Sequence, residues 1–350
     1  MSVTLKDVAQ IAGVSTASAS RALRGFDTVD PLIRERVTKA AQRLGYVGSH
    51  AAAALATGRA GSIGIITPFL DRLAFQRMLT GVHGVLHTAQ LDVLVHCTGD
   101  PSDPHPVPPH RRLARRVNGF IVLSLAANSP DIADLLRLDL PVAMFGAHAY
   151  GTSSVHIDDW GGSAGAIEHL IDGGHRRIGV IYGREADNPA VLELERHRGM
   201  RDAFRRVGVP LPAELLVPGD FTMAGGDRAM ARLLSLDDPP TAVFAFSDEM
   251  AYGAIQALRA RGLNAGSDVA LVGYDGHALS AALELSTVSV PFEEIGATVA
   301  RQVLDRIQQP GLPDVREILP TQFVARFSSR ARPGGAGRAV ADAGDGAASS

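Results

Sequence analysis

Residues 8–23 read VAQIAGVSTASASRAL. This segment predicts two short helices, over residues 5–12 and 16–23, joined by a tight turn at Gly13. Two helices that cross at such a turn can share a small apolar core. We expect that core to consist of Val8, Ala12, Val14, Ala19 and Leu23.

Residues typical of helix ends accompany the predicted helices. Thr4 and Asp7 form a variant of the capping box before the first helix. Ser15 can cap the second helix through its side-chain oxygen. Asp30 can cap a third helix whose first residue is Pro31, a position where the missing N–H of proline costs nothing. The sequence therefore predicts three short helices at the N-terminus.

The outward face of the second helix suits a surface that reads DNA. Arginine can donate two hydrogen bonds to guanine, and Ala or Thr methyl groups can contact the thymine methyl group. The start of a recognition helix enters the major groove, although a helical hairpin with a generic polar face is the alternative. We predict an all-α helix-turn-helix domain over residues 1–47, with these DNA-binding residues: Thr4, Ser15, Thr16, Ala17, Ser20 and Arg21.

The charges of the chain are unevenly distributed. The 350 residues carry a formal net charge of −3, but residues 1–60 contain eight Lys or Arg and four acidic residues, so this segment has +4 and the remainder −7. A basic head on an acidic body suits a module that meets DNA phosphates and a body that does not. The lone Cys97 gives no sign of an oxidising compartment. Because we find no signal segment and no apolar run of membrane length, we expect a cytoplasmic protein.

Short apolar runs alternate with amphipathic helical patterns from residue 62 to about residue 330. Such alternation predicts an α/β core with parallel sheets covered by helices, and the number of units implies two lobes. The expected strands lie at residues 63–67, 92–96, 119–124, 141–145, 177–182, 241–246 and 269–273. The expected helices include residues 72–90, 161–171, 190–207, 225–236 and 249–261.

Three further segments have a composition of their own. Residues 48–61 are an alanine-rich hinge or linker, whose short helix is marginal alone in water and would order on a partner. The proline-rich residues 101–109 predict an exposed loop. Residues 331–350 are rich in Gly, Ala and Ser, which predicts a disordered tail.

An ordered set of motifs runs through the chain. In the headpiece it comprises residues 3–9, 14–15, 20–21, 36–37 and 44–46. In the core it comprises residues 57–59, 63–64, 173–178, 247–248 with Ala251, 272–275, and 319–321 with Arg326. This set resembles the lactose-repressor/galactose-repressor (LacI/GalR) family over about residues 3–330.

The resemblance implies a helix-turn-helix headpiece, a hinge helix and a two-lobed core like a periplasmic binding protein. It also implies a homodimer that binds a near-palindromic operator and releases or grips DNA when a small metabolite occupies the cleft. We place the core at residues 62–330. Its lobe 1 spans about 62–159 and 292–320, and its lobe 2 about 160–291 and 321–330.

The hinge departs from the family pattern Tyr-x-Pro-Asn-x-x-Ala-Arg-x-Leu. Tyr46 is present, but Gly48-Ser49 replace Pro-Asn, and Ala53 replaces the arginine. Leu55 matches the leucine that opens a base step in the minor groove, and we add it to the DNA-binding residues. A plain linker is the alternative interpretation.

The resemblance also identifies a cleft. Ser247 and Asp275 follow predicted strands, and parallel sheets bind ligands at the carboxyl ends of their strands. Ser247 stands where the family usually has Asn, so the ligand contact differs there. The alternatives are a solvated arginine, a loop-capping aspartate and core phenylalanines. The expected ligand-binding residues are Phe75, Asp158, Arg196, Phe221, Ser247 and Asp275.

We expect no enzymatic chemistry, cofactor or metal. Residues 161–165 match the Gly-x-Ser-x-Gly pattern of a hydrolase, but that motif needs a strand running directly into the turn, and residues 158–160 intervene. His169 and His175 are six residues apart and do not share a helical face, and the chain lacks a zinc-type cysteine set. A phosphate-binding Gly-x-x-x-x-Gly-Lys is also absent.

The function predicted is a ligand-responsive transcription regulator, which we expect to be a repressor. A neutral carbohydrate is the expected effector because Asp158 and Asp275 would both oppose an anion, while Arg196 is the cation predicted at the cleft. A purine or nucleoside is the second choice. Alternatives from other classes are a sugar-binding protein without a DNA role and a hydrolase built on Ser163. The expected partners are operator DNA, the effector and a second copy of the chain, with no membrane.

Overall fold

The computed structural model describes residues 3–23, 28–46, 61–98, 113–125, 130–183 and 191–330. Its contacts divide the chain into two compact units, a headpiece within residues 1–61 and a core that occupies nearly all of the chain from Ser62 onward. Most of the predicted hinge with Leu55, the proline-rich loop at residues 101–109 and the tail at residues 331–350 lie outside the described residues.

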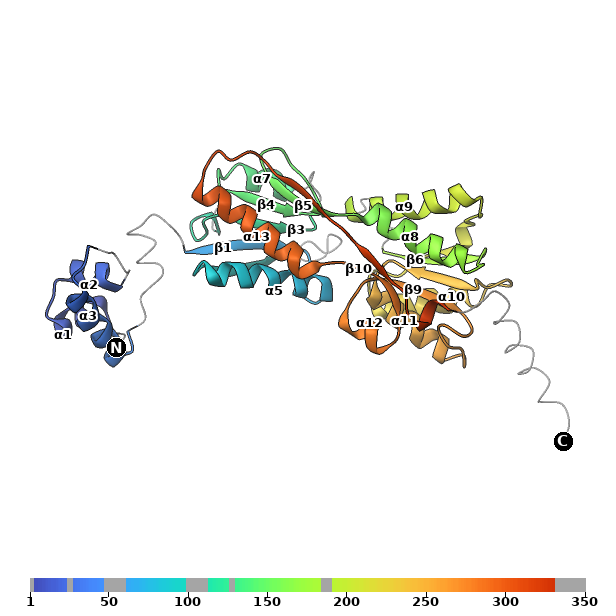
Figure 1. Ribbon diagram of the computed structural model, residues 1–350, viewed down its shortest axis with the longest axis horizontal. Helices are drawn as coiled ribbons and strands as arrows, with labels where there is room; N and C mark the ends of the chain where they lie inside the picture. Colours follow the sequence, from blue (N-terminus) through green and yellow to red (C-terminus); the bar gives the residue numbers. More distant parts are fainter. Residues whose placement is uncertain are drawn as a thin grey trace, which may run out of the picture. The chain divides into compact units, whose positions relative to one another are not determined.

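The headpiece contains the three predicted helices. They are α1 (Leu5–Ala12), α2 (Thr16–Leu23) and α3 (Pro31–Leu44), and the first two have the predicted bounds (Figure 1). Gly13 follows α1 with a φ of +65°, which permits the tight turn that a residue with a side chain would resist. The capping interactions predicted for Thr4 and Asp30 are both present.

The core of the headpiece differs from the prediction at one residue. Leu23 is 37% exposed and does not belong to the buried cluster, whereas its neighbour Ala22 does. Ala19 and Ala22 lie three residues apart on one face of α2, and Leu23 lies about 100° further round the helix. The buried residues are Val8, Ala9, Ala12, Ala19, Ala22, Val37, Ala40 and Ala41.

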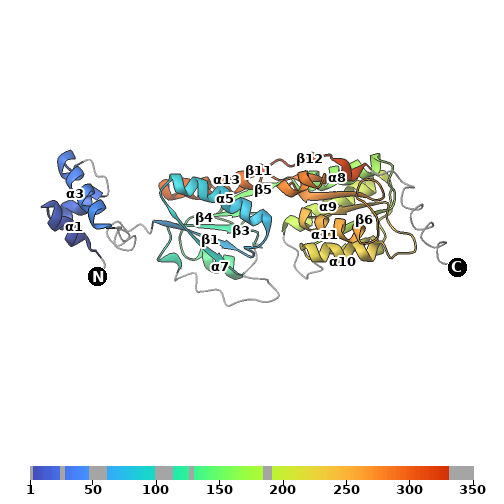
Figure 2. The same ribbon diagram turned by 90° about the horizontal axis from the view of Figure 1, so that it is seen from below.

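The first sheet of the core has six parallel strands in the order β11-β5-β4-β3-β1-β2. We call this sheet and its helices the first lobe. Helices α5 and α13 cover one face of the sheet, and α7 covers the other (Figure 2). The strands are β1 (Ser62–Thr67), β2 (Asp92–Cys97), β3 (Phe120–Leu123), β4 (Val142–Phe145), β5 (Ser153–Ile157) and β11 (Arg316–Leu319). The helices are α5 (Leu73–Thr88), α7 (Pro130–Leu136) and α13 (Phe292–Gln308).

The second sheet has the order β12-β10-β9-β8-β6-β7 and is parallel except for β12, which runs antiparallel to β10. This sheet and its helices form the second lobe, with α8 and α9 on one face and α10 and α11 on the other (Figures 1 and 2). The strands are β6 (Ile178–Tyr182), β7 (Leu216–Pro218), β8 (Ala242–Ala245), β9 (Ala270–Asp275), β10 (Ser286–Ser289) and β12 (Gln322–Val324). The helices are α8 (Asp159–Asp172), α9 (Val191–Val207), α10 (Met223–Leu233), α11 (Asp248–Arg259) and α12 (Ala278–Ala282), with 3₁₀ turns η1 (Ala213–Leu215) and η2 (Phe327–Ser329).

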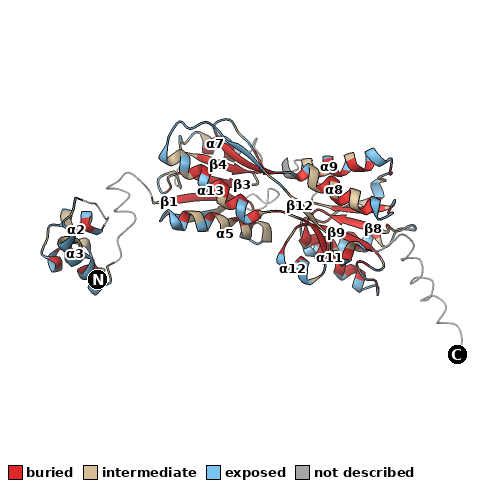
Figure 3. Cartoon of the chain, in the orientation of Figure 1, coloured by how far each residue is buried: buried red, intermediate tan, exposed pale blue. Residues whose placement is uncertain are grey.

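The chain passes between the two lobes after β5, after β10 and between β11 and β12. Strands β1, β3 and β4 of the first sheet and β8 and β9 of the second are buried along their whole length (Figure 3), which explains their nearly continuous apolar sequence. The predicted fold class is confirmed, and all seven predicted strands are present with ends shifted by at most two residues. The elements not predicted are β5, β7, β10, β11, β12, α7, α12 and α13.

Glycines allow the outer helices of each lobe to pack closely. A Cβ at Gly81 of α5 would lie 1.9 Å from the carbonyl oxygen of Glu293 in α13, and one at Gly296 of α13 would lie 2.0 Å from the carbonyl oxygen of Met78 in α5. The second lobe shows the same close packing, because a Cβ at Gly226 of α10 or at Gly253 of α11 would lie within 2.0 Å of the backbone of the facing helix. Only glycine fits at these crossings.

Candidate functional site

The start of α2 presents the predicted DNA-reading residues at the surface of the headpiece. Thr16, Ala17 and Arg21 are exposed, while Ser20 is half-buried. Ser15 is exposed and accepts a hydrogen bond from the Ser18 amide (3.1 Å), so it caps α2 as predicted. The Arg21 Nε reaches back along the helix to the Ala17 carbonyl oxygen (3.4 Å).

One interaction at each end of α1 holds the helix that precedes α2. The Thr4 hydroxyl donates to the Asp7 carboxylate (2.7 Å) and accepts from the Asp7 amide, which closes the capping box of α1. The guanidinium of Arg36 in α3 donates to the carbonyl oxygen of Ala12 at the end of α1. Arg36 belongs to one of the motifs noted above, and this contact gives it a structural role in the helix-turn-helix.

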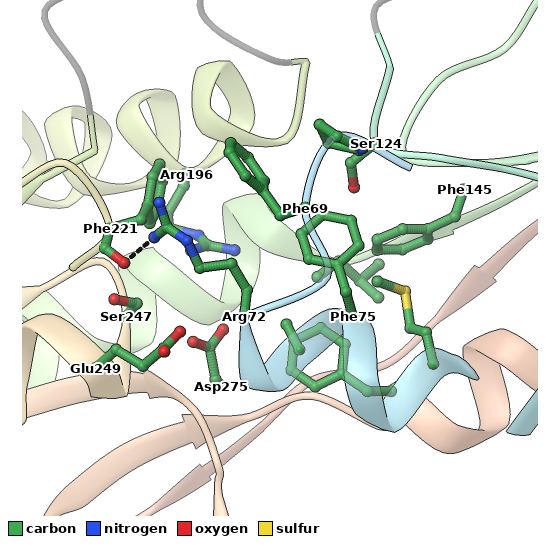
Figure 4. Close-up of a pocket in the computed structure, with 15 residues that line it drawn as sticks. Phe69, Arg72, Phe75, Ser124, Phe145, Arg196, Phe221, Ser247, Glu249 and Asp275 are labelled. Carbon is green, nitrogen blue, oxygen red and sulfur yellow. Dashed lines mark hydrogen bonds between the residues drawn. The ribbon is translucent and has the colours of Figure 1, made fainter. Parts of the chain in front are cut away.

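The core contains a cavity of about 170 Å³ that both lobes line (Figure 4). Its lining comes from the carboxyl ends of β1, β3, β4, β5 and β9 and from the starts of α5, α11 and α13. This is the edge where parallel sheets bind ligands. The lining residues are Pro68, Phe69, Arg72, Ala74, Phe75, Met78, Ser124, Phe145, Ile157, Arg196, Phe221, Ser247, Glu249, Asp275 and Phe292.

Five of the six residues expected at the cleft line this cavity: Phe75, Arg196, Phe221, Ser247 and Asp275. Asp158 is not among the lining residues. It is exposed, and its carboxylate accepts a hydrogen bond from the Gly161 amide (2.8 Å) as the N-cap of α8. The next residue, Asp159, is the buried acid that pairs with the cavity-lining Arg196.

Asp159 holds Arg196 in place. Nε and one terminal nitrogen of Arg196 donate to the same carboxylate oxygen of Asp159 (2.9 and 2.7 Å), and the other terminal nitrogen donates to the Phe246 carbonyl oxygen (2.5 Å). The guanidinium also lies 3.6 Å from the centre of the Tyr274 ring. Burial raises the pKa of Asp159, although Arg196 opposes that shift. The orientation of the guanidinium is therefore fixed before a ligand arrives.

Two acids face the cavity from the second lobe. Asp275 ends β9 with a φ of +121°, a conformation that costs free energy for a residue with a side chain and is concentrated at binding sites. Its carboxylate lies 3.5 Å from Nε2 of His277. Glu249, two residues after Ser247 in α11, was not predicted. Burial, followed by the charge of Asp275, raises the pKa of Glu249 to about 7.

Arg72 joins the two lobes beside the cavity. It precedes α5 in the first lobe, and its guanidinium donates to the carbonyl oxygens of Phe221 and Asp220 (3.3 Å for Asp220) in the second lobe (Figure 4). Both of these residues adopt left-handed backbone angles, with φ of +53° and +57°. The same guanidinium lies 4.8 Å from the ring centre of Phe69. Sequence patterns gave no signal for Arg72, because its partners lie in another lobe.

The motif residues Asp248 and Gly273 organise the strand ends behind the cavity. The Asp248 carboxylate accepts from the His277 amide (2.8 Å) and the Thr287 hydroxyl (2.6 Å), among other donors. Burial, then the charge of Asp275, raises the pKa of Asp248 to about 6. A Cβ at Gly273 would lie 2.3 Å from the Asp248 carboxylate, which explains the glycine. These two residues position the turn after Asp275.

The arrangement around Ser163 differs from a hydrolase elbow. Ser163 lies inside α8, is fully buried, and donates to the carbonyl oxygen of Asp159 (2.8 Å). His169 and His175 contact the hydroxyls of Ser329 and Thr241, respectively. Within the described part of the chain, no group of three or more His, Cys, Asp or Glu side chains could hold a metal ion. No described helix is long and apolar enough to cross a membrane.

A helix-turn-helix headpiece followed by a two-lobed binding core defines a class of ligand-binding regulators, and comparisons with known proteins agree with that class. Residues 4–49 match the family of bacterial regulatory proteins described as lacI family. Residues 167–329 match a periplasmic binding protein-like domain. The HTH-type transcriptional regulator CelR of Thermobifida fusca is 34% identical over 337 residues, which cover 93% of this chain and 98% of that protein.

Solved structures give the same result. A lac repressor dimer bound to operator and the anti-inducer ONPF has a TM-score of 0.80 at 26% identity, covering 94% of this chain and 99% of that one. A CelR–cellobiose complex has a TM-score of 0.67 at 31% identity, covering 93% and 99%. The chain belongs to the LacI family of transcriptional regulators, and it is a DNA-binding regulator controlled by a small effector.

Proposed function

We propose that this protein is a repressor that binds a near-palindromic operator as a homodimer and whose grip on DNA is controlled by a carbohydrate in the core cavity. The observation that carries the proposal is the cavity itself, which Arg196 lines from α9, Glu249 from the start of α11 and Asp275 from the end of β9. Carboxylates accept hydrogen bonds from hydroxyls and the guanidinium donates to oxygens, which is the chemistry that a sugar needs. The relative solved with cellobiose supports this class of effector.

The charges around the cavity oppose an anion less strongly than the sequence suggested. Asp158 caps α8 and does not line the cavity, and Arg72 adds a second cation there. Glu249 is an added acid, but burial raises its pKa to about 7, so only part of its charge is present at neutral pH. A neutral sugar remains the proposed ligand because the two cations are already bound: Arg196 by Asp159, and Arg72 by backbone carbonyl oxygens. We propose binding, and no catalysis, at this site.

The DNA-binding assignment is tested by selecting operator fragments from a random DNA pool with the full chain and then titrating variants against the selected operator. Arg21→Ala should cost about 1–3 kcal/mol at the operator and relax the preference at one base pair, because a base-reading contact is lost. Arg43→Ala is the matched control, since Arg43 is exposed on α3. Arg43→Ala should remove no more than a contact to a DNA phosphate, so it should change the affinity for every DNA sequence by the same factor. If Arg21→Ala leaves the preference unchanged, α2 is not the recognition helix.

A further inference from the structure

The two lobes contribute opposite kinds of side chain to the cavity. Of the ten lining residues from the first lobe, two have polar side chains, Arg72 and Ser124. Of the five from the second lobe, one is apolar, Phe221. Figure 4 shows the aromatic rings of Phe69, Phe75 and Phe145 on one side, with Ser124 near them, and Arg196, Ser247, Glu249 and Asp275 gathered on the other.

We propose that the effector is an aryl glycoside, a sugar that carries an apolar aromatic group; this inference rests on the proposed function of the cavity as a carbohydrate site. The sugar contacts the polar wall, which we define as Arg196, Ser247, Glu249 and Asp275. The aromatic aglycone contacts the apolar wall, which we define as Phe69, Phe75, Met78, Phe145 and Phe292.

The apolar wall is larger than a sugar needs. One aromatic ring suffices to cover the apolar face of a sugar, and Phe221 already supplies a ring beside the polar wall. Four further phenylalanines and a methionine line the opposite side, and all but Phe69 are more than 90% buried. Phe69 and Phe75 form an edge-to-face pair with ring centres 6.0 Å apart, the arrangement in which aromatic groups add favourable contacts. An aromatic ring of the ligand can pack against these two rings in the same way.

The polar wall suits hydroxyl groups. Asp275 and Glu249 present carboxylate oxygens, and in the described part of the chain the only partner of the Asp275 carboxylate within ion-pair distance is His277. Three of the five N–H groups of Arg196 are bound by Asp159 and Phe246, which leaves two for a ligand. Ser247 accepts from the Met250 amide (3.2 Å) and keeps its hydroxyl proton to donate. Together these groups offer both donors and acceptors.

A nucleoside is the other molecule that joins a sugar to an aromatic ring, but the apolar wall disfavours it. A nucleobase carries several ring and exocyclic polar atoms. With the sugar on the polar wall, Ser124 is the polar side chain available to the base on the first-lobe side, because Arg72 is engaged with Asp220 and Phe221. Each buried polar atom left without a partner costs binding free energy. A phenyl aglycone has no polar atoms on its ring, so none is left without a partner.

Calorimetry on the full chain tests the proposal with matched pairs of methyl and phenyl glycosides, as α and β anomers of glucose, galactose, mannose and xylose, together with adenosine and cytidine. For at least one sugar the phenyl glycoside should bind roughly 10- to 100-fold more tightly than the methyl glycoside, because a ring is removed from water. The same phenyl glycoside should change retention of the selected operator by the protein.

Four variants assign the effect to the two walls. Phe69→Ala should lower the ratio of phenyl to methyl affinity, because it removes a ring from the apolar wall. Leu70→Ala, the exposed neighbour outside the lining, should leave the ratio unchanged. Glu249→Gln should alter both affinities by the same factor and so also leave the ratio unchanged. Phe145→Leu, which keeps an apolar side chain, gives a second test of the apolar wall.

The outcomes separate the two proposals. If methyl and phenyl glycosides of every sugar bind equally well, the aryl glycoside is wrong while the carbohydrate effector stands. If a nucleoside binds and no phenyl glycoside does, the aryl glycoside is also wrong. If no glycoside in the panel binds, the carbohydrate effector itself is wrong, and the inference falls with it.

Discussion

Glu249 is a residue whose charge depends on pH near neutrality. Burial and the nearby Asp275 raise its pKa from 4.5 to about 7, against the opposing effects of Arg72 and His277. A carboxyl group with a raised folded-state pKa binds more protons in the folded than in the unfolded state between these values. Its contribution to stability therefore falls as the pH rises from about 4.5 to about 7.

Replacing Glu249 with glutamine should remove this dependence. Urea unfolding followed by circular dichroism should give a higher free energy of unfolding for Glu249→Gln than for the wild type at pH 8, where the wild-type carboxylate is charged in the folded state. The difference should shrink toward pH 5.5, where that carboxyl is mostly protonated. A difference that is the same at both pH values would contradict a raised pKa.

The ion pair between Arg196 and Asp159 was not predicted, although both residues are near positions that the sequence placed at the cleft. The strand-end rule for parallel sheets placed Ser247 and Asp275 at the cavity, and both line it. The acid paired with Arg196 is Asp159, one position beyond the predicted Asp158. A helix turns by about 100° per residue, and one step separates a solvent-facing cap from a buried partner. Substituting Arg196 leaves the Asp159 carboxylate buried without its partner, so such a variant measures stability as well as binding.

At the scale of elements, glycine positions set how closely α5 approaches α13. Gly81→Ala should lower the free energy of unfolding by about 1–3 kcal/mol, because the new methyl group would lie 1.9 Å from the Glu293 carbonyl oxygen and the helices must separate. Gly84 lies three residues further along the same helix with no atom within 4 Å of its Cβ position. Gly84→Ala should therefore raise stability by about 0.5–1 kcal/mol. Urea titrations of both variants decide this, and equal changes in the same direction would contradict the close packing.

Strands with an apolar sequence could be predicted, whereas strands that bury polar side chains could not. β5 reads SSVHI and β10 reads STVS, so neither has the apolar run typical of a buried strand. Their polar groups find partners far away in sequence: Ser153 accepts from the Val315 amide (3.2 Å), and Thr287 donates to Asp248 (2.6 Å). A local pattern cannot show such partners. The sequence of α13, in contrast, has apolar residues with helical spacing, so this helix could have been predicted.

The apolar wall of the cavity was beyond prediction for a similar reason. Phe69 follows β1, Phe145 ends β4 and Phe292 begins α13, and each alone is typical of a core residue. Only the order of the strands in the first sheet brings their ends to one edge. Family resemblance supplied Phe75 and Phe221, whereas the segregation of apolar and polar side chains between the lobes became visible in the structure.

At the scale of the whole molecule, the headpiece and the core have separate hydrophobic clusters that share no residue. Each cluster excludes water from its own helices or sheets, so each unit has the means to fold alone. A fragment of residues 61–330 should therefore keep the fold of the core and bind the phenyl glycoside selected above with the same affinity as the full chain in the absence of DNA. Far-ultraviolet circular dichroism and calorimetry check both statements.

Operator DNA should distinguish the fragment from the full chain. In the full chain, effector and operator affect each other by one coupling free energy, so a ligand that weakens operator binding by some factor must bind the operator complex more weakly by that same factor. The fragment lacks the headpiece, and adding operator should leave its affinity for the ligand unchanged. Calorimetry on both proteins, with and without operator, measures the two factors. An effect of operator on the fragment would place a DNA contact in the core, and no effect on the full chain would mean that occupancy of the cavity does not control the headpiece.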